Sequence, residues 1–153
     1  MADASPRLAH TAWLLTGDQL LTEELVQEAL TRTYLAWRKV RGRAPYDYAR
    51  RVLVGRRVKA RQGQNREPAF ESVPEQAEAG DEATVIERDR LVRALSTLTP
   101  RQRRIVVLRH MVGLSEQEVA ADLGVSLGTI KSTASRGLAQ LRGILEAADD
   151  DEA

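Results

Sequence analysis

The sequence predicts an all-α protein made of two small helical domains joined by a flexible acidic linker. Apolar residues make up 42% of the 153 residues, whereas aromatic residues make up only 4%. This composition favours helices packed through Leu, Val and Ala over a β-sandwich. Apolar positions recur with helical spacing along most of the chain. The exception is residues 62–83, which combine Gly, Pro and acidic residues in the manner of a linker.

These patterns divide the chain into four parts. The first domain spans residues 5–64, the acidic linker 65–84 and the second domain 85–147. Residues 148–153 form an acidic tail, which we expect to be disordered because it has almost nothing apolar to bury.

Three helices are predicted in the first domain, over residues 6–15, 22–37 and 45–60. The first should end at the turn signal around Gly17, and Thr22 should cap the second. The second helix should bury one stripe, with Trp37 in the core. That stripe consists of Leu25, Val26, Ala29, Leu30, Thr33 and Leu35. Residues 42–45 break the pattern, and the third helix should pack through Val52, Leu53 and Val58.

The second domain should begin with helices over residues 84–98 and 100–112. The first of these is expected to bury Val85, Ile86, Leu91, Leu95 and Leu98. Thr99 is a suitable N-cap and Pro100 a suitable first helical residue, while Gly113 should end the second helix.

Charge is distributed unevenly, although the net charge is only +1. Residues 32–66 hold twelve basic residues against Asp47, residues 67–89 hold eight acidic residues against Arg88, and residues 90–142 hold nine basic residues against three acidic ones. Two basic modules on either side of an acidic segment indicate two polyanion-binding surfaces. The plain alternative is a set of solvated charged faces.

Residues 114–132 predict a helix-turn-helix. Ser115 and Glu118 match a capping box, Gly124 can end the helix in the left-handed conformation, and Ser126 can cap the next helix. The small side chain of Ala120 would let the two helices cross closely. The inward positions are Val119, Ala120 and Leu123 on the first helix, and Ile130, Ala134, Leu138 and Leu141 on the second.

The second helix of this motif would enter the major groove with its N-terminal residues first. Its outward residues suit contacts with bases or phosphates: Lys131, Ser132, Ser135 and Arg136. Ser126 and Thr129, near free backbone N–H groups, suit a phosphate. A helical hairpin without a DNA role is the structural alternative, and the motif alone leaves repressors, response regulators and sigma factors open.

Other functional classes find little support. The chain has no cysteine, the N-terminus lacks a signal-peptide pattern, and no apolar run could span a bilayer. We therefore expect a cytoplasmic protein without membrane insertion. His10 and His110 are isolated from acidic ligands, and no nucleotide-binding loop or catalytic triad is present. We expect no catalytic residues, no metal, no cofactor and no enzymatic activity.

The chain resembles extracytoplasmic-function (group IV) RNA polymerase sigma factors, in the style of actinobacterial members. Region 2 of that family is matched by residues 12–18 (AWLLTGD), 24–30 (ELVQEAL), 34–37 (YLAW) and 50–54 (RRVLV). Region 4 is matched by residues 94–95 (AL), 98–103 (LTPRQR), 107–109 (VLR), 113–120 (GLSEQEVA) and 128–132 (GTIKS). Gly55 stands where family members often have Asn.

The resemblance implies core RNA polymerase, through its β′ coiled coil and β flap, and promoter DNA as partners, with an anti-sigma factor as a further one. The helix over 22–37 would dock on polymerase through Glu24, Gln27 and Glu28, although an acidic helix start stabilised by the helix dipole fits equally well. The basic third helix would hold the melted −10 strand through Arg50, Arg51, Arg56, Arg57 and Lys59. Tyr46 and Tyr48 could stack on its bases or serve in packing, and the helix-turn-helix would bind the −35 element.

An autonomous dimeric repressor or activator built on the same helix-turn-helix is the main alternative. Such a protein would bind palindromic sites tightly on its own. The basic first domain, which a simple repressor does not need, favours a sigma factor that directs promoter recognition and transcription initiation. A protein that inhibits polymerase is a third, more distant reading.

Overall fold

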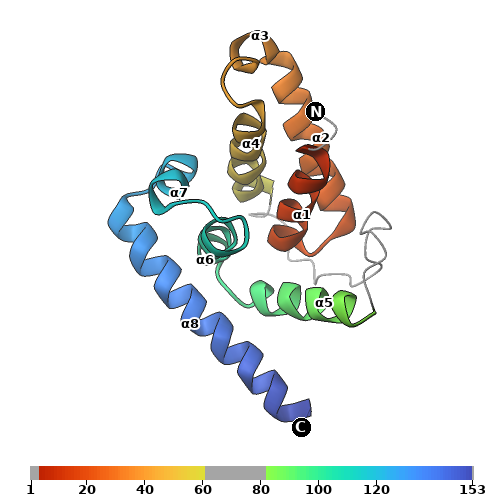
Figure 1. The fold of residues 1–153 in the computed structure, drawn as a ribbon, viewed down its shortest axis with the longest axis vertical. Coiled ribbons are helices and arrows are strands. Elements are labelled where there is room, and N and C mark those ends of the chain that lie inside the picture. The colour runs from red at the N-terminus through yellow and green to blue at the C-terminus, as the bar shows by residue number, and fades with distance from the viewer. Residues whose placement is uncertain (1–3, 61–81, 153) are drawn as a thin grey trace. The chain divides into compact units, whose positions relative to one another are not determined.

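The computed structural model describes residues 4–60 and 82–152 (Figure 1). All the regular elements in these residues are helices, which confirms the predicted all-α class. The chain divides into two compact units between Ser72 and Val73, a point that falls within the predicted linker. The linker itself lies outside the described residues, apart from its last three positions, which already belong to a helix.

The first unit is built from four helices, α1 (Ala4–Thr16), α2 (Gln19–Leu35), α3 (Trp37–Val40) and α4 (Pro45–Ala60). Helix α2 packs against both α1 and α4 (Figure 1). The core of the unit is aliphatic and includes Leu8, Leu15, Ala29, Leu53 and Val54, all fully buried. This core supports the long α2 and α4, which carry the predicted polymerase and DNA residues.

Helix α2 begins earlier than predicted. The Asp18 carboxylate accepts a hydrogen bond from the Leu21 backbone N–H at 3.0 Å and so caps the helix. Thr22, the predicted cap, is buried, and its hydroxyl lies 3.0 Å from the Thr16 hydroxyl. The predicted cap was therefore wrong, because Thr22 satisfies its hydroxyl across the α1–α2 corner.

The predicted stripe of α2 is buried at Leu25, Val26, Ala29 and Thr33. It fails at the C-terminal end, since Leu35 is 78% exposed. Leu35 follows Thr33 by two residues, which is about 200° around the helix, so it faces away from the core. Trp37, expected in the core, is 38% exposed at the start of α3. Both predictions were wrong. The exposed side chains of Leu35 and Trp37 form apolar surface at this end of the unit.

The second unit comprises α5 (Glu82–Ser96), α6 (Pro100–Val106), the π-helix η1 (Val107–Met111), α7 (Glu116–Leu123) and α8 (Leu127–Glu152). Leu95 and Leu98 are buried as predicted, but Ile86 is 62% exposed. Helix α5 packs against α8 and buries Val92, Ala94 and Leu95, and Ile86 lies about 120° around the helix from Val92. The prediction for Ile86 was wrong.

The connection from α6 to the helix-turn-helix differs from the single helix expected over residues 100–112. Thr99 caps α6 as predicted, and its backbone N–H donates to the Gln102 side chain at 3.1 Å to complete a capping box. The helix then widens into a π turn, in which the Val112 N–H donates to the Val107 carbonyl at 2.9 Å. Gly113, with φ +85°, ends the segment as predicted.

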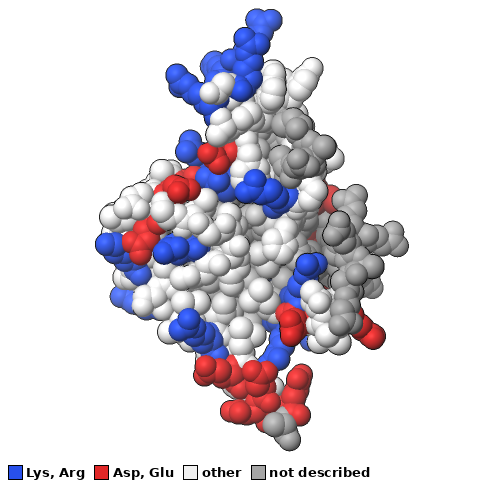
Figure 2. All heavy atoms as spheres, in the orientation of Figure 1, with Lys and Arg blue, Asp and Glu red and all other residues white. Residues whose placement is uncertain are grey.

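The acidic tail was expected to be disordered, but α8 continues to Glu152. Arg90 on α5 explains the difference: its guanidinium donates to the Leu145 carbonyl at 3.0 Å and pairs with the Asp149 carboxylate. A cation thus neutralises part of the negative charge at the end of the helix, where acidic residues are unfavourable. Figure 2 shows acidic side chains gathered over this end of α8.

Candidate nucleic-acid interface

Three local caps shape the helix-turn-helix formed by α7 and α8. The Ser115 hydroxyl accepts from the Glu118 N–H at 3.1 Å and lies 3.2 Å from the Glu118 carboxylate, to which it donates. Gly124 ends α7 with φ +64°, in the left-handed region. The Ser126 hydroxyl accepts from the Thr129 N–H at 3.3 Å at the start of α8. The structure confirms Ser115 and Ser126 as N-caps and Gly124 as the helix end, and therefore the predicted turn. The predicted capping box differs in one bond, because the Glu118 carboxylate accepts from the Ser115 hydroxyl.

Helix α8 packs closely against α6. Its buried positions are Ile130, Ala134, Gly137 and Leu141. A Cβ placed on Gly137 would lie 2.6 Å from the Val106 Cγ2, so the two helices meet where only a hydrogen atom fits. Gly137 was not predicted as a packing residue, although the sequence signal was present: it follows the inward Ile130 and Ala134 at helical spacing. Ala120, the small residue that was predicted instead, is half-buried.

The outward face of α8 carries the residues predicted for DNA. Lys131, Ser132, Ser135 and Arg136 are all exposed. The Lys131 ammonium lies 3.8 Å from the Glu116 carboxylate at the start of α7, and the Ser132 hydroxyl donates to the Thr129 carbonyl at 3.3 Å. These four side chains thus share one accessible side of the helix that follows the turn.

The start of α8 is less open than predicted. The hydroxyls of Ser126 and Thr129 lie 2.8 Å apart and bond to one another, so both take part in the cap. Ser126 is exposed and Thr129 half-buried. Leu127, which was not among the predicted DNA-binding residues, is 37% exposed at this end.

The basic helix α4 divides into residues with different environments. Arg50 is only 3% exposed; its guanidinium lies 2.9 Å from the Asp47 carboxylate and 5.8 Å from the centre of the Tyr46 ring. Arg7 on α1 lies 4.0 Å over the same ring. The structure therefore places Tyr46 in the packing between α1 and α4, which is one of the two roles expected for it. Arg50 is buried beside it, which does not fit the expected role of Arg50 in holding DNA.

The other basic residues of α4 are Arg51, Arg56, Arg57 and Lys59. Arg51 is exposed. Arg56, Arg57 and Lys59 lie on the last turns of α4, but their side chains, like that of Val58, are outside the described residues.

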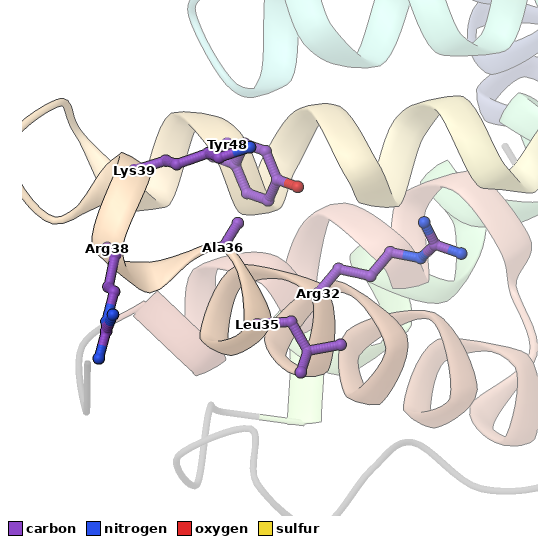
Figure 3. A pocket seen from close by; sticks show the side chains of 6 residues that line it. All are labelled: Arg32, Leu35, Ala36, Arg38, Lys39 and Tyr48. Atoms are coloured by element: carbon purple, nitrogen blue, oxygen red, sulfur yellow. The ribbon is translucent and has the colours of Figure 1, made fainter.

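A hollow of about 420 Å³ lies where α2 and α3 meet α4 (Figure 3). Its lining is basic and apolar, and consists of Arg32, Leu35, Ala36, Arg38, Lys39 and Tyr48. The Tyr48 ring comes from α4, and Arg38 and Lys39 come from α3 (Figure 3). Figure 2 shows basic side chains gathered over the end of the unit that carries α3. Tyr48 is thus the predicted aromatic residue that lines a hollow together with basic side chains.

The predicted polymerase-binding residues lie on α2. Glu24 and Gln27 are exposed, whereas Glu28 is half-buried and its carboxylate lies 3.3 Å from the Arg32 guanidinium. Leu35 is on the same side of the helix as Glu24 and Gln27, because spacings of three, eight and eleven residues return close to the starting direction. This side of α2 therefore combines acidic, polar and apolar surface.

The two histidines lie on α1 and on the π-helix η1. His10 and His110 are exposed, and partial burial, together with the charges of Arg109 and Arg142, lowers the pKa of His110. Within residues 4–60 and 82–152 no three His, Cys, Asp or Glu side chains are grouped as metal ligands would be. The helices described also include none long and apolar enough to cross a membrane.

Both units match known family models. Sigma-70 region 2 matches residues 2–67, which contain the α2–α4 surfaces, and sigma-70 region 4 matches residues 88–141, which contain the helix-turn-helix. The fold and the site together define a helical transcription initiation factor of the sigma-70 type.

Proteins with similar sequences identify the subgroup of sigma factors to which the chain belongs. The chain is 40% identical over 148 residues to the RNA polymerase sigma-E factor of Streptomyces coelicolor, covering 94% of this chain and 82% of that protein. It is 32% identical to the ECF RNA polymerase sigma factor SigE of Mycolicibacterium smegmatis, covering 91% of this chain and 57% of that protein. The chain belongs to the extracytoplasmic-function (ECF) RNA polymerase sigma factors.

A solved structure has a similar fold. The sigma factor RpoE, crystallised in complex with the anti-sigma factor NepR from Bartonella quintana, is 26% identical with a TM-score of 0.70. The match covers 94% of this chain and 92% of that one.

Proposed function

We propose that this sigma factor binds core RNA polymerase and directs it to promoters through two DNA-reading surfaces, one on each unit. The observation that carries the proposal is the exposed group Lys131, Ser132, Ser135 and Arg136 on the helix that follows a fully capped turn. A helix presented in this way fits the major groove, where cationic and hydroxyl side chains contact bases and phosphates. We assign this surface to the −35 element.

We assign binding of the −10 element to the first unit. Arg51 and the hollow beside Tyr48, with Arg38 and Lys39, combine positive charge with an aromatic ring. Single strands bind such surfaces through their phosphates and by base stacking. Arg56, Arg57 and Lys59 extend the same helix and remain part of this assignment. Arg50 is left out, because its guanidinium is buried against Asp47.

Polymerase would meet the exposed side of α2. Glu24 and Gln27 supply polar contacts, and Tyr34 and Leu35, which are 75% and 78% exposed, supply apolar ones. Exposed apolar residues beside charged ones are typical of interaction sites. We assign the β′ coiled coil to this side and the β flap to the second unit, and expect the protein to act without catalytic residues in the cytoplasm.

An anti-sigma factor is a further expected partner. The Bartonella quintana relative was crystallised with one. A partner that covers the exposed residues of α2 would compete directly with polymerase for the same surface.

Run-off transcription tests the proposal against an autonomous regulator. Core polymerase should yield discrete transcripts from genomic fragments only when this protein is added. The free protein should bind the same fragments weakly, because its two basic surfaces would act together only on polymerase. Tight, palindrome-dependent binding by the free protein, without new transcripts, would establish a repressor or activator instead.

A further inference from the structure

Leu127 is an apolar residue in an unusual place. In the part of the second unit that the structure describes, the exposed large apolar side chains are Ile86, at 62%, and Leu127, at 37%. Ile86 lies on α5, far along the chain from the helix-turn-helix. Leu127 is the first residue of α8, on the end that the proposed function sends deepest into the major groove.

The surroundings of Leu127 leave it accessible. Ser126, directly before Leu127, and Thr129, two residues after it, turn their hydroxyls to each other at 2.8 Å. Gly128 has no side chain, and nothing lies within 4 Å of the point where its Cβ would be. Lys131, one turn further on, is exposed and 3.8 Å from Glu116. A neighbouring base edge could therefore approach Leu127 without displacing another side chain.

The chemistry of Leu127 selects its ligand. An aliphatic side chain offers no hydrogen bond, so it cannot read the donors and acceptors of a base edge. The major groove presents one apolar group, the C5-methyl group of thymine. Covering this methyl group removes apolar surface from water on both partners, which is the source of hydrophobic stabilisation.

We infer that Leu127 contacts the methyl group of a thymine in the −35 duplex and so contributes to promoter specificity. The inference rests on the proposed function and adds an apolar contact to the polar ones assigned to Lys131, Ser132, Ser135 and Arg136.

Deoxyuridine, which is thymine without the methyl group, provides the test. Holoenzyme reconstituted with core polymerase first selects its preferred upstream element from a randomised duplex library. Each thymine of that duplex, on either strand, is then replaced singly by deoxyuridine. The unmodified protein should bind about fourfold more weakly at one position, the loss expected for one methyl group.

A protein variant completes a double-mutant cycle between the side chain and the thymine methyl group. Leu127→Ala should bind the thymine duplex about fourfold more weakly and should lose its sensitivity to deoxyuridine at that position. Ile86→Ala removes an exposed aliphatic side chain on α5 and should keep both the affinity and the sensitivity. Circular dichroism checks that the helices persist in both variants, and the deoxyuridine result on the unmodified protein does not depend on folding of a variant.

Two results would overturn the inference. One is equal binding of the unmodified protein to all deoxyuridine duplexes. The other is Leu127→Ala holoenzyme that remains as sensitive to the missing methyl group as the original. If the unmodified holoenzyme selects no upstream sequence at all, the proposed −35 function fails together with this inference, which distinguishes that outcome from the other two.

Discussion

The role of a single residue in this protein depends on the atoms that its side chain contacts. Gly137 shows this for packing, because the Val106 side chain occupies the space that any larger residue would need. Arg50 shows it for charge, because its neighbours Asp47 and Tyr46 bury a side chain that looks like a DNA ligand in the sequence.

Gly137→Ala should destabilise the second unit by about 1–3 kcal/mol, because the added methyl group overpacks the α6–α8 crossing. Thermal unfolding measures the change. Gly143→Ala is the matched control: it lies on the same helix with nothing within 4 Å of its Cβ position. That control should stabilise the helix by up to about 1 kcal/mol. Equal effects of the two substitutions would contradict the close crossing.

Lys131→Ala and Arg136→Ala should each weaken holoenzyme binding to a −35 duplex by about 1–3 kcal/mol if the contact is to a base. A phosphate contact should weaken all sequences alike and reduce the salt dependence of binding by about one unit of slope. Fluorescence anisotropy over a salt series separates the two cases. Arg142→Ala is the control, because Arg142 is exposed further along α8. Unchanged binding by both test variants would refute the assignment.

At the scale of the element, helices α2 and α8 each serve two purposes at once. One side of α2 packs on α1 and α4 while the other is exposed from Glu24 to Leu35. Helix α8 begins as the outward face of the helix-turn-helix and ends as the partner of α5, through Arg90. A substitution on one side of such a helix should therefore change one property and leave the other intact.

Glu24→Lys combined with Leu35→Ala should weaken holoenzyme assembly about tenfold, or about 1.4 kcal/mol, by reversing a charge and removing an apolar contact. The free energy of unfolding should change little, because both side chains are exposed. Titration of labelled protein with core polymerase measures the affinity. Glu87→Lys is a matched control, since Glu87 is exposed and holds the same sixth position in α5 that Glu24 holds in α2. A parallel loss of stability and assembly in the double variant would mean that the two residues are structural.

For the whole molecule, two compact units with their own cores are joined by one acidic stretch. Helix α4 ends at Ala60 and α5 begins at Glu82, so residues 61–81 connect them. If both units bind the same promoter, this connection sets the effective concentration of the second unit once the first has bound.

Doubling the connection with an uncharged Gly/Ser insert of equal length should lower that effective concentration about threefold, following the −3/2 power of length. Binding of holoenzyme to a promoter with both elements should weaken by no more than this factor. Binding to an isolated −35 duplex should not change and serves as the control. A much larger loss, or a change in short abortive transcripts, would show that the acidic stretch acts as more than a tether.

The helix-turn-helix and most helix ends could be predicted from the sequence because they depend on residues close together in the chain. Ser115, Gly124 and Ser126 each act within three or four positions, through a cap or a backbone conformation that the residue type favours. The exposure of Leu35 could also have been predicted from its angle to Thr33. By themselves, these local patterns determined the helical class, the turn and the outward face of α8.

Other features were decided by the tertiary structure alone, since each depends on a neighbour distant in the sequence or on competition among partners. The acidic end of α8 stays helical because Arg90 reaches it from 59 positions away. The tight α6–α8 crossing requires Val106 opposite Gly137, and the Tyr46 ring beside Arg50 is covered by Arg7 of α1, which lies far from it in the sequence. Local propensity carries no information about such contacts, because burial depends on what the folded chain brings to each side chain.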